Sequence, residues 1–107
     1  MIDPQMKRGL LESCVLAILC RGESHGYKII RDLSPCIEVS ESTLYPILRR
    51  LESAGCLEVR SVEHSGRLRK LYSITPKGRE QMEEFLESWG EIVAVYDFIR
   101  RVHDDEK

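Results

Sequence analysis

The sequence lacks the residue patterns on which most metal sites and enzymes depend. Its four cysteines include no CxxC pair, which argues against a structural zinc site. Its three histidines, His25, His64 and His103, are scattered without metal-ligand spacing. It has no glycine-rich phosphate loop and no serine in a nucleophile-elbow context. We therefore expect a protein that is not an enzyme and that uses no metal and no cofactor.

Long hydrophobic runs are missing as well. No segment approaches the roughly 18 consecutive apolar residues that a membrane-spanning helix needs. The stretch MIDPQMKRG at the start contains no apolar core of a secretory signal, so we expect a cytoplasmic protein with no membrane partner. A length of 107 residues suits one domain, or a small domain with an appended element.

Positive charge is modest overall but is concentrated in the middle of the chain. The formal net charge is −2, which is unusual for a protein that binds nucleic acid. Residues 26–79 nevertheless hold ten basic and six acidic side chains, whereas residues 80–107 hold three basic and nine acidic ones. Attraction to phosphate depends on the local field. The central segment therefore suits a nucleic-acid partner, and the C-terminal segment should face away from it.

Two helices are expected at the start of the sequence. Residues 8–21 carry apolar side chains at helical spacing, and Gly22 ends that pattern. A second helix is expected over residues 25–33, where Ser24 can serve as the N-cap. The residues expected to point inward from this second helix are Tyr27, Ile30 and Leu33.

A third helix is expected over residues 40–54. Ser40 is a good N-cap, and Gly55 stands where a left-handed C-cap belongs. Pro46 fits poorly, because proline has no N–H and crowds the carbonyl of Ser42. Either the helix begins at Ser42, which places Pro46 near the first turn, or the helix is distorted there. The stripe expected to face the core is Leu44, Ile47, Leu48 and Leu51.

A β-hairpin is expected after this helix. Residues 57–63 and 69–75 are rich in strand-forming residues and flank Ser65 and Gly66, with a loop longer than a tight turn. Basic residues near the tip of such a hairpin are placed where a wing contacts DNA phosphates. These residues are Arg67, Arg69 and Lys70.

The outer side of the third helix carries hydroxyl and guanidinium groups that can reach base edges or phosphates. Taken alone, that side could equally be an ordinary solvated surface. The basic hairpin beside it favours a helix that enters a DNA groove, as in a winged helix-turn-helix. The residues that we expect to contact DNA from this helix are Ser40, Ser42, Thr43, Tyr45, Arg49 and Arg50.

A long helix is expected to close the chain, from about residue 76 to residue 101, followed by a frayed HDDEK tail. Large apolar residues recur along it with alternating spacings of three and four, as in a coiled-coil seam. The small preceding body cannot cover the whole seam, so we expect a homodimer. The seam residues are Met82, Phe85, Trp89, Ile92, Tyr96 and Ile99.

Trp89 is the only tryptophan of the sequence. Packing within the seam is one interpretation of it. The other is an effector site, because two indoles facing each other across a dimer axis could hold a small planar aromatic compound between them. The sequence does not decide between the two.

Three stretches of the sequence resemble the PadR family of bacterial transcriptional regulators. They are LLESCVLAILCRGESHGYKIIRDL, STLYPILRRLESAGCLE and GRLRKLYSITPKGRE, which together span residues 8–80 in order. The single short C-terminal helix is similar to that of the smaller subfamily. The resemblance implies a homodimeric winged-helix repressor that binds an inverted-repeat operator. It also implies that a phenolic or drug-like compound could act as effector, although some members have no known ligand.

The predicted fold is mainly α with a small β-hairpin: a winged helix-turn-helix plus a long C-terminal dimerisation helix. We expect a DNA-binding domain over residues 1–77 and the dimerisation helix with its tail over residues 78–107. The predicted function is a homodimeric regulator of transcription that binds double-stranded DNA, with a small aromatic effector as a possible ligand. The alternatives are a winged-helix module for protein–protein interaction and a regulator without any small-molecule effector.

Overall fold

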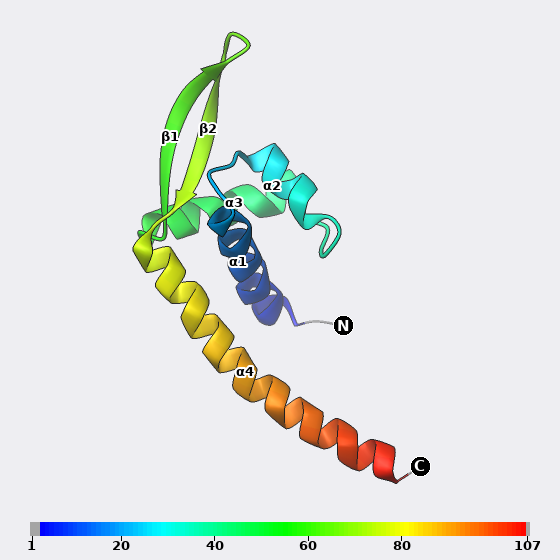
Figure 1. Cartoon of the computed structure of the whole chain (residues 1–107). Helices are drawn as coiled ribbons and strands as arrows, with labels where there is room; N and C mark the ends of the chain where they lie inside the picture. Colours follow the sequence, from blue (N-terminus) through cyan, green and yellow to red (C-terminus); the bar gives the residue numbers. More distant parts are fainter. Residues whose placement is uncertain (1–2, 107) are drawn as a thin grey trace.

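A computed structural model of the chain describes residues 3–106, so residues 1–2 and 107, at the outer ends of the two expected domains, lie outside the description. The predicted fold class is confirmed: a mainly helical chain with one antiparallel hairpin and a long last helix (Figure 1). The elements are α1 Pro4–Cys20, α2 Gly26–Leu33, α3 Glu41–Ser53, β1 Leu57–His64, β2 Arg67–Ile74 and α4 Pro76–Asp105.

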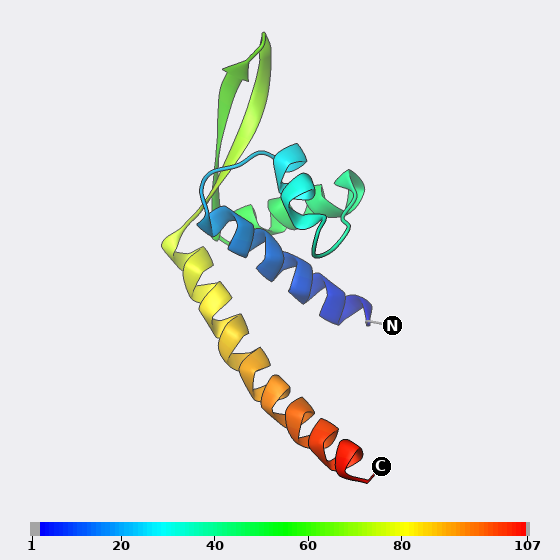
Figure 2. The same cartoon turned by 45° about the vertical axis from the view of Figure 1, so that its right-hand side comes forward.

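The molecule is elongated, with extents of 63 × 25 × 22 Å. Helices α1, α2 and α3 form a small body, from which the hairpin projects in one direction and α4 in another (Figures 1 and 2). A single apolar core lies among the three helices and the root of the hairpin. Its fully buried large side chains are Leu16, Leu19, Ile29, Leu44, Leu48 and Leu51.

Helix α1 begins earlier than the apolar pattern predicted. The pattern placed its start near residue 8, but the Asp3 carboxylate accepts hydrogen bonds from the backbone N–H of Gln5 at 3.0 Å and of Met6 at 3.4 Å. Pro4 follows as the first helical residue, a position where its missing N–H costs nothing. The polar first turns were therefore missed because they carry a cap but no apolar stripe.

Two predictions about α2 were wrong. Its N-cap is His25, whose Nδ1 accepts from the Lys28 backbone N–H at 3.3 Å, while Ser24 instead pairs with β2. Tyr27 does not point inward, since 67% of it is exposed. The first inward position belongs to Gly26, which an apolar pattern cannot detect because glycine has no side chain. It leaves room for the ring of Tyr45.

Helix α3 has the expected caps. Ser40 is its N-cap, and Gly55 follows its end with a φ of 81°, in the left-handed region that glycine adopts readily. The helix begins at Glu41, so Pro46 lies past the first turn, inside a continuous helix. Because proline lacks an N–H, the carbonyl of Ser42 does not receive the usual i to i+4 hydrogen bond.

The hairpin closes through a tight turn, which corrects the expectation of a longer loop. His64 pairs with Arg67, so only Ser65 and Gly66 form the connection. Both have positive φ, 52° and 80°, as a type I′ turn requires. A longer loop was expected because the strands were placed at residues 57–63 and 69–75, whereas they extend to His64 and begin at Arg67.

The α1–α2 loop is tied to the hairpin. Ser24 pairs with Tyr72 of β2 through two backbone hydrogen bonds of 3.1 and 2.8 Å. Beside this pair, the Glu23 carboxylate accepts from Arg60 at 2.8 and 2.6 Å and from the Ser73 hydroxyl at 3.0 Å. Arg60 thereby lowers the pKa of Glu23. These bonds fix where the hairpin stands relative to α2.

Helix α4 is longer than predicted. It continues to Asp105 instead of ending near residue 101, so most of the tail that was expected to fray is helical. Its start is firmly held, because the Thr75 hydroxyl donates to the Gly55 carbonyl at 2.7 Å and accepts from the Gly78 N–H at 3.1 Å. Further along, the Met82 sulfur lies 3.8 Å from that of Cys20 on α1.

Gly78 is required by the close approach of α4 to Cys56, which lies between α3 and β1, and to the end of β2. A Cβ at this position would collide with the Cys56 carbonyl oxygen and lie 2.7 Å from Cγ1 of Ile74. We expect Gly78→Ala to lower the free energy of unfolding by about 1–3 kcal/mol, as overpacked sites do. Gly90→Ala is the control, since a Cβ there meets nothing within 4 Å, and it should be stabilising by about 0.5–1 kcal/mol. Equal urea midpoints for the two variants would contradict this packing.

Candidate nucleic-acid interface

The outer side of α3 is the first part of the candidate interface. The predicted core stripe is confirmed, because Leu44, Ile47, Leu48 and Leu51 are buried. At about 100° per residue, this burial directs Ser42, Pro46 and Arg49 away from the core. All three are exposed, and we call them the α3 strip. A partner that approaches α3 from solvent meets these three residues first.

The hydroxyls at the start of α3 form a small cluster. The Ser40 hydroxyl accepts from the Thr43 backbone N–H at 3.3 Å and lies 3.0 Å from the Ser42 hydroxyl and 3.1 Å from that of Thr43. Ser40 is therefore committed to capping the helix. Ser42 and Thr43 are exposed and keep hydrogen-bonding capacity for a ligand.

The two adjacent arginines of α3 differ in what surrounds them. Arg50 donates from Nε to the Glu12 carboxylate of α1 at 2.6 Å and is engaged in holding α3 against α1. Arg49 lies on the exposed strip, and within residues 3–106 no carboxylate lies within ion-pair distance of it. Of the two, Arg49 has the guanidinium group that can reach a groove.

Tyr45 lies on the flank of α3 that faces α2. It is half-buried and packs on the core, with its hydroxyl end beside Gly26. The side chain is thus fixed by packing, and only part of it is accessible to a ligand. Its sequence position gave no sign of this, because the space that it fills is left by a glycine on another helix.

The three basic residues predicted near the hairpin tip lie on β2. Arg67 follows the turn directly, with Arg69 and Lys70 further along the strand. Alternation along a strand places Arg67 and Arg69 on one face and Lys70 on the other. In the part of the chain that the structure describes, none of the three has a carboxylate within ion-pair distance. Leu68 between them is 80% exposed, so the tip also offers an apolar contact.

A second basic group, which the sequence pattern did not predict, flanks α3 on its other side. Lys7 and Arg8 of α1 line a hollow together with Ser42, Thr43 and Pro46. The two residues were overlooked because they precede the apolar stripe of α1. Two adjacent basic residues in the first turns of α1 were the available signal.

A larger hollow of about 620 Å³, the α2–hairpin trough, separates the start of α2 from β2. Tyr45 brings α3 to its border. Its charged or aromatic lining residues are His25, Tyr27, Tyr45, His64, Arg67, Arg69, Lys70 and Tyr72. The trough thus joins the α3 flank and the hairpin into one continuous basic and aromatic surface.

The expected seam of α4 divides into two parts. Met82, Phe85 and Trp89 are half-buried, and Met82 packs against the core of its own chain. The Phe85 and Trp89 rings lie 5.7 Å apart between centroids, tilted by 38°. Beyond Trp89 the whole helix is exposed. The exposed seam residues are Ile92, Tyr96 and Ile99.

The exposed half of α4 carries more apolar residues than the seam alone. The additional ones are Val93, Val95, Phe98 and Val102. At about 100° per residue, Val93 and Phe98 lie on opposite flanks of the Ile92–Ile99 line. These residues were not predicted, because the expected seam followed one line of spacing three and four. So broad an apolar surface at the end of a helix is typical of a protein contact.

Within residues 3–106 no three His, Cys, Asp or Glu side chains gather in a way that could hold a metal ion. None of the described helices is long and apolar enough to cross a membrane.

Comparison with known proteins matches the chain to one protein family and to several solved structures. The model of the Transcriptional regulator PadR-like family matches residues 15–84. Transcriptional regulator Rv3488 of Mycobacterium tuberculosis is 35% identical over 81 residues, which are 75% of this chain and 76% of that protein.

Solved structures agree with the family match. A PadR-like transcriptional regulator from Bacillus cereus is 38% identical, with a TM-score of 0.77, and the match covers 89% of this chain and 95% of that one. A PadR-like transcription factor from Bacteroides fragilis is 35% identical, with a TM-score of 0.79, and the match covers 89% and 94% of the two chains.

Proposed function

The chain belongs to the PadR-like family of transcriptional regulators, and on that premise we propose that it is a homodimeric repressor that binds an inverted-repeat operator. Membership makes it a DNA-binding regulator and confirms the expectation that it is not an enzyme. We propose that residues 1–77 bind DNA and that residues 78–107 form the dimer contact. Because a transcriptional regulator must reach the DNA, we also propose that the protein is cytoplasmic.

One observation carries the proposed mode of binding. The α3 strip and the hairpin expose arginines that lack acidic partners within residues 3–106, whereas Arg50 and Arg60 are paired with carboxylates. Arginine fits guanine edges and phosphates alike. We assign base reading to Arg49 with Ser42, Thr43 and the accessible part of Tyr45, while Ser40 holds the start of the helix.

The hairpin has a different proposed task. Arg67, Arg69 and Lys70 contact backbone phosphates, which position the protein without reading sequence. Arg50 contributes by fixing α3 to Glu12 of α1, and it borders the hollow that Lys7 and Arg8 line. Lys7 and Arg8 extend the basic surface along the other flank of α3.

The homodimer is proposed from the exposed part of α4. A single chain leaves Ile92, Tyr96 and Ile99 in water together with four further apolar residues. A second copy related by a two-fold axis would cover them and would present two α3 helices to two half-sites. Met82, Phe85 and Trp89 border this contact where α4 leaves the body. An operator with inverted symmetry follows from the two-fold axis.

The alternative is a winged-helix module that binds another protein, because one fold can host several functions. A gel shift separates the two. The DNA upstream of the protein's own gene should be retarded in the presence of excess random-sequence duplex, and a reporter driven by that DNA should be repressed. Retardation that random-sequence duplex abolishes at equal concentration would contradict a specific operator.

Trp89 is the proposed site for a small aromatic effector. Its indole lies beside the Phe85 ring, and Glu87 and Glu91 on the same helix favour a cationic compound. Because Trp89 is the only tryptophan, its fluorescence should be quenched by planar aromatic cations in a saturable way. Trp89→Ala should lose compound binding, measured by calorimetry, and keep its affinity for DNA. Unchanged emission across such a panel would favour a regulator without this effector.

A further inference from the structure

The α2–hairpin trough has a use beyond the α3 strip and the wing, and the inference rests on the proposed function. It is lined by Tyr45 of α3, by His25 and Tyr27 at the start of α2, and by residues of β2. In helix-turn-helix proteins the helix that precedes the recognition helix lies across the DNA backbone. A DNA duplex that lies along α3 and the hairpin would therefore also pass the trough.

The charged groups that influence the His25 imidazole are basic residues. Lys28 and Arg31 lie near it on α2, His64 on β1 and Arg69 on β2. Burial, followed by the charge of Arg69 and of the α2 residues, lowers the pKa of this imidazole. No carboxylate contributes to the shift. Arg67, Arg69 and Lys70 line the trough itself, and no acidic side chain of residues 3–106 is among its lining.

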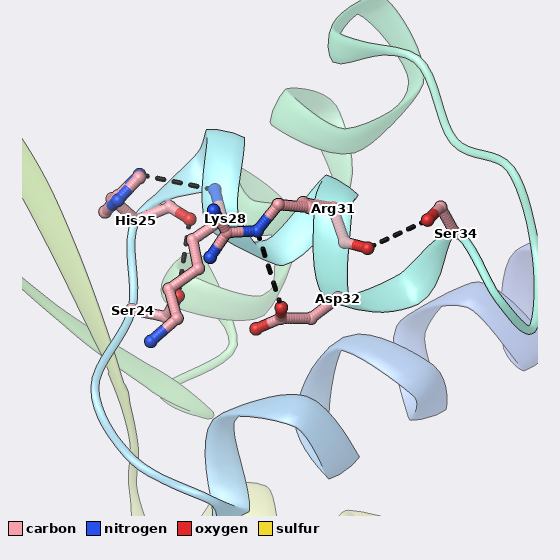
Figure 3. A network of polar contacts seen from close by, with 6 residues as sticks. All are labelled: Ser24, His25, Lys28, Arg31, Asp32 and Ser34. Carbon is pink, nitrogen blue, oxygen red and sulfur yellow. Dashed lines mark hydrogen bonds and ion pairs between the residues drawn. The ribbon is translucent and has the colours of Figure 1, made fainter.

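The cations in and near the trough are largely free of acidic partners, although Lys28 and Arg31 lie outside its lining. Arg69 is half-buried, yet no carboxylate within residues 3–106 lies in ion-pair distance of it or of Lys28. Only Arg31 has one, a loose contact of 3.9 Å from its Nε to the neighbouring Asp32 (Figure 3). An anion in the trough would supply the negative charge that these cations lack.

Backbone donors face the trough as well. Tyr72 forms its two hydrogen bonds with Ser24, on the side of β2 that is turned away from β1. In an antiparallel strand the backbone groups alternate in direction, so the N–H groups of Lys70 and Leu68 point to that same side. The paired segment of the α1–α2 loop ends at this bridge, and beyond it the edge of β2 borders the trough.

Two side-chain donors complete the site. His25 uses Nδ1 to accept from the Lys28 N–H, so its proton is on Nε2, the other edge of the ring (Figure 3). Tyr27 is largely exposed, and its hydroxyl is available to a ligand. We propose that the trough holds one phosphate of the DNA backbone, bound by the Arg69 guanidinium, the Lys70 backbone N–H, the Tyr27 hydroxyl and Nε2–H of His25. An extended peptide could use the same strand edge, but the cations favour the phosphate.

The test uses the full-length protein and a random-sequence duplex, because a phosphate contact needs no operator. Binding is followed by fluorescence anisotropy over a range of salt concentrations. Tyr27→Phe removes only a hydroxyl, and His25→Asn keeps an N-capping side chain while removing the ring. Arg69→Gln removes one charge in the trough, and Arg101→Gln is its matched control on the exposed end of α4.

Tyr27→Phe and His25→Asn should each weaken binding by about threefold to tenfold. Arg69→Gln should lower the slope of log affinity against log salt by about 0.9, the value for one lost phosphate contact, whereas Arg101→Gln leaves it unchanged. The proposal is overturned if Tyr27→Phe and His25→Asn bind like the wild type, even when Arg69→Gln is weaker, since Arg69 would then act only as part of the wing. A wild-type protein that binds no duplex at all would instead refute the proposed function.

Discussion

Ile99→Asp should convert the protein from a dimer to a monomer and reduce operator affinity by at least about 100-fold. Ile99 is 60% exposed on the apolar side of α4, so the monomer tolerates a carboxylate there. In the proposed dimer the same carboxylate would be buried without a partner, which is strongly unfavourable. A monomer contacts only one half-site, and linking two contacts commonly raises the affinity by about 10²–10⁴ over a single contact.

Ala94→Asp is the matched control for this variant. It introduces the same carboxylate on the same exposed helix, about 140° around the axis from Ile99. It should remain a dimer and bind the operator like the wild type. Sedimentation equilibrium reports the mass of each variant, and circular dichroism should show equal helix content. A wild-type protein that sediments as a monomer at micromolar concentration would refute the proposed dimer.

Arg49→Ala should weaken operator binding by about 1–3 kcal/mol and relax the preference at one base pair of each half-site. The expected loss follows from an exposed guanidinium that no carboxylate within residues 3–106 holds in place. Binding to random-sequence duplex should change much less. Competition with operators altered one base pair at a time measures both effects.

Arg67→Ala provides the contrast, because Arg67 follows the turn of the hairpin. It should weaken binding to the operator and to random-sequence duplex by a similar factor and lower the salt slope by about one. If Arg49→Ala also affects both DNAs equally, α3 positions the protein and reads no base at that residue. Circular dichroism of both variants should match the wild type, since neither side chain is buried.

The apolar periodicity and the caps explain how much of this fold the sequence predicts. Leu44, Leu48 and Leu51 recur at helical spacing, and Ser40 and Gly55 bracket them with strong local preferences. Such signals act within one turn of helix and do not depend on distant residues. The end of α3 and its core-facing stripe therefore follow from the sequence alone, whereas Pro46 left the start of the helix open.

The errors arose where the decisive partner is distant in sequence. Tyr27 was assigned to the core because its spacing fits, but Gly26 occupies the inward position to make room for Tyr45, nineteen residues further on. Ser24 was assigned a cap because it is a good one, but Tyr72 pairs with its backbone. The trough could not be predicted for the same reason, since its walls come from α2 and β2.

Footprinting of the full-length protein on the DNA upstream of its own gene tests the proposed mode of operator binding most directly. We expect two protected patches related by inverted symmetry, with centres about 10–10.5 base pairs apart or at a multiple of that spacing. Ile99→Asp should erase both patches together, while Ala94→Asp should preserve them. A single asymmetric patch that survives in Ile99→Asp would contradict a two-fold dimer that reads an inverted repeat.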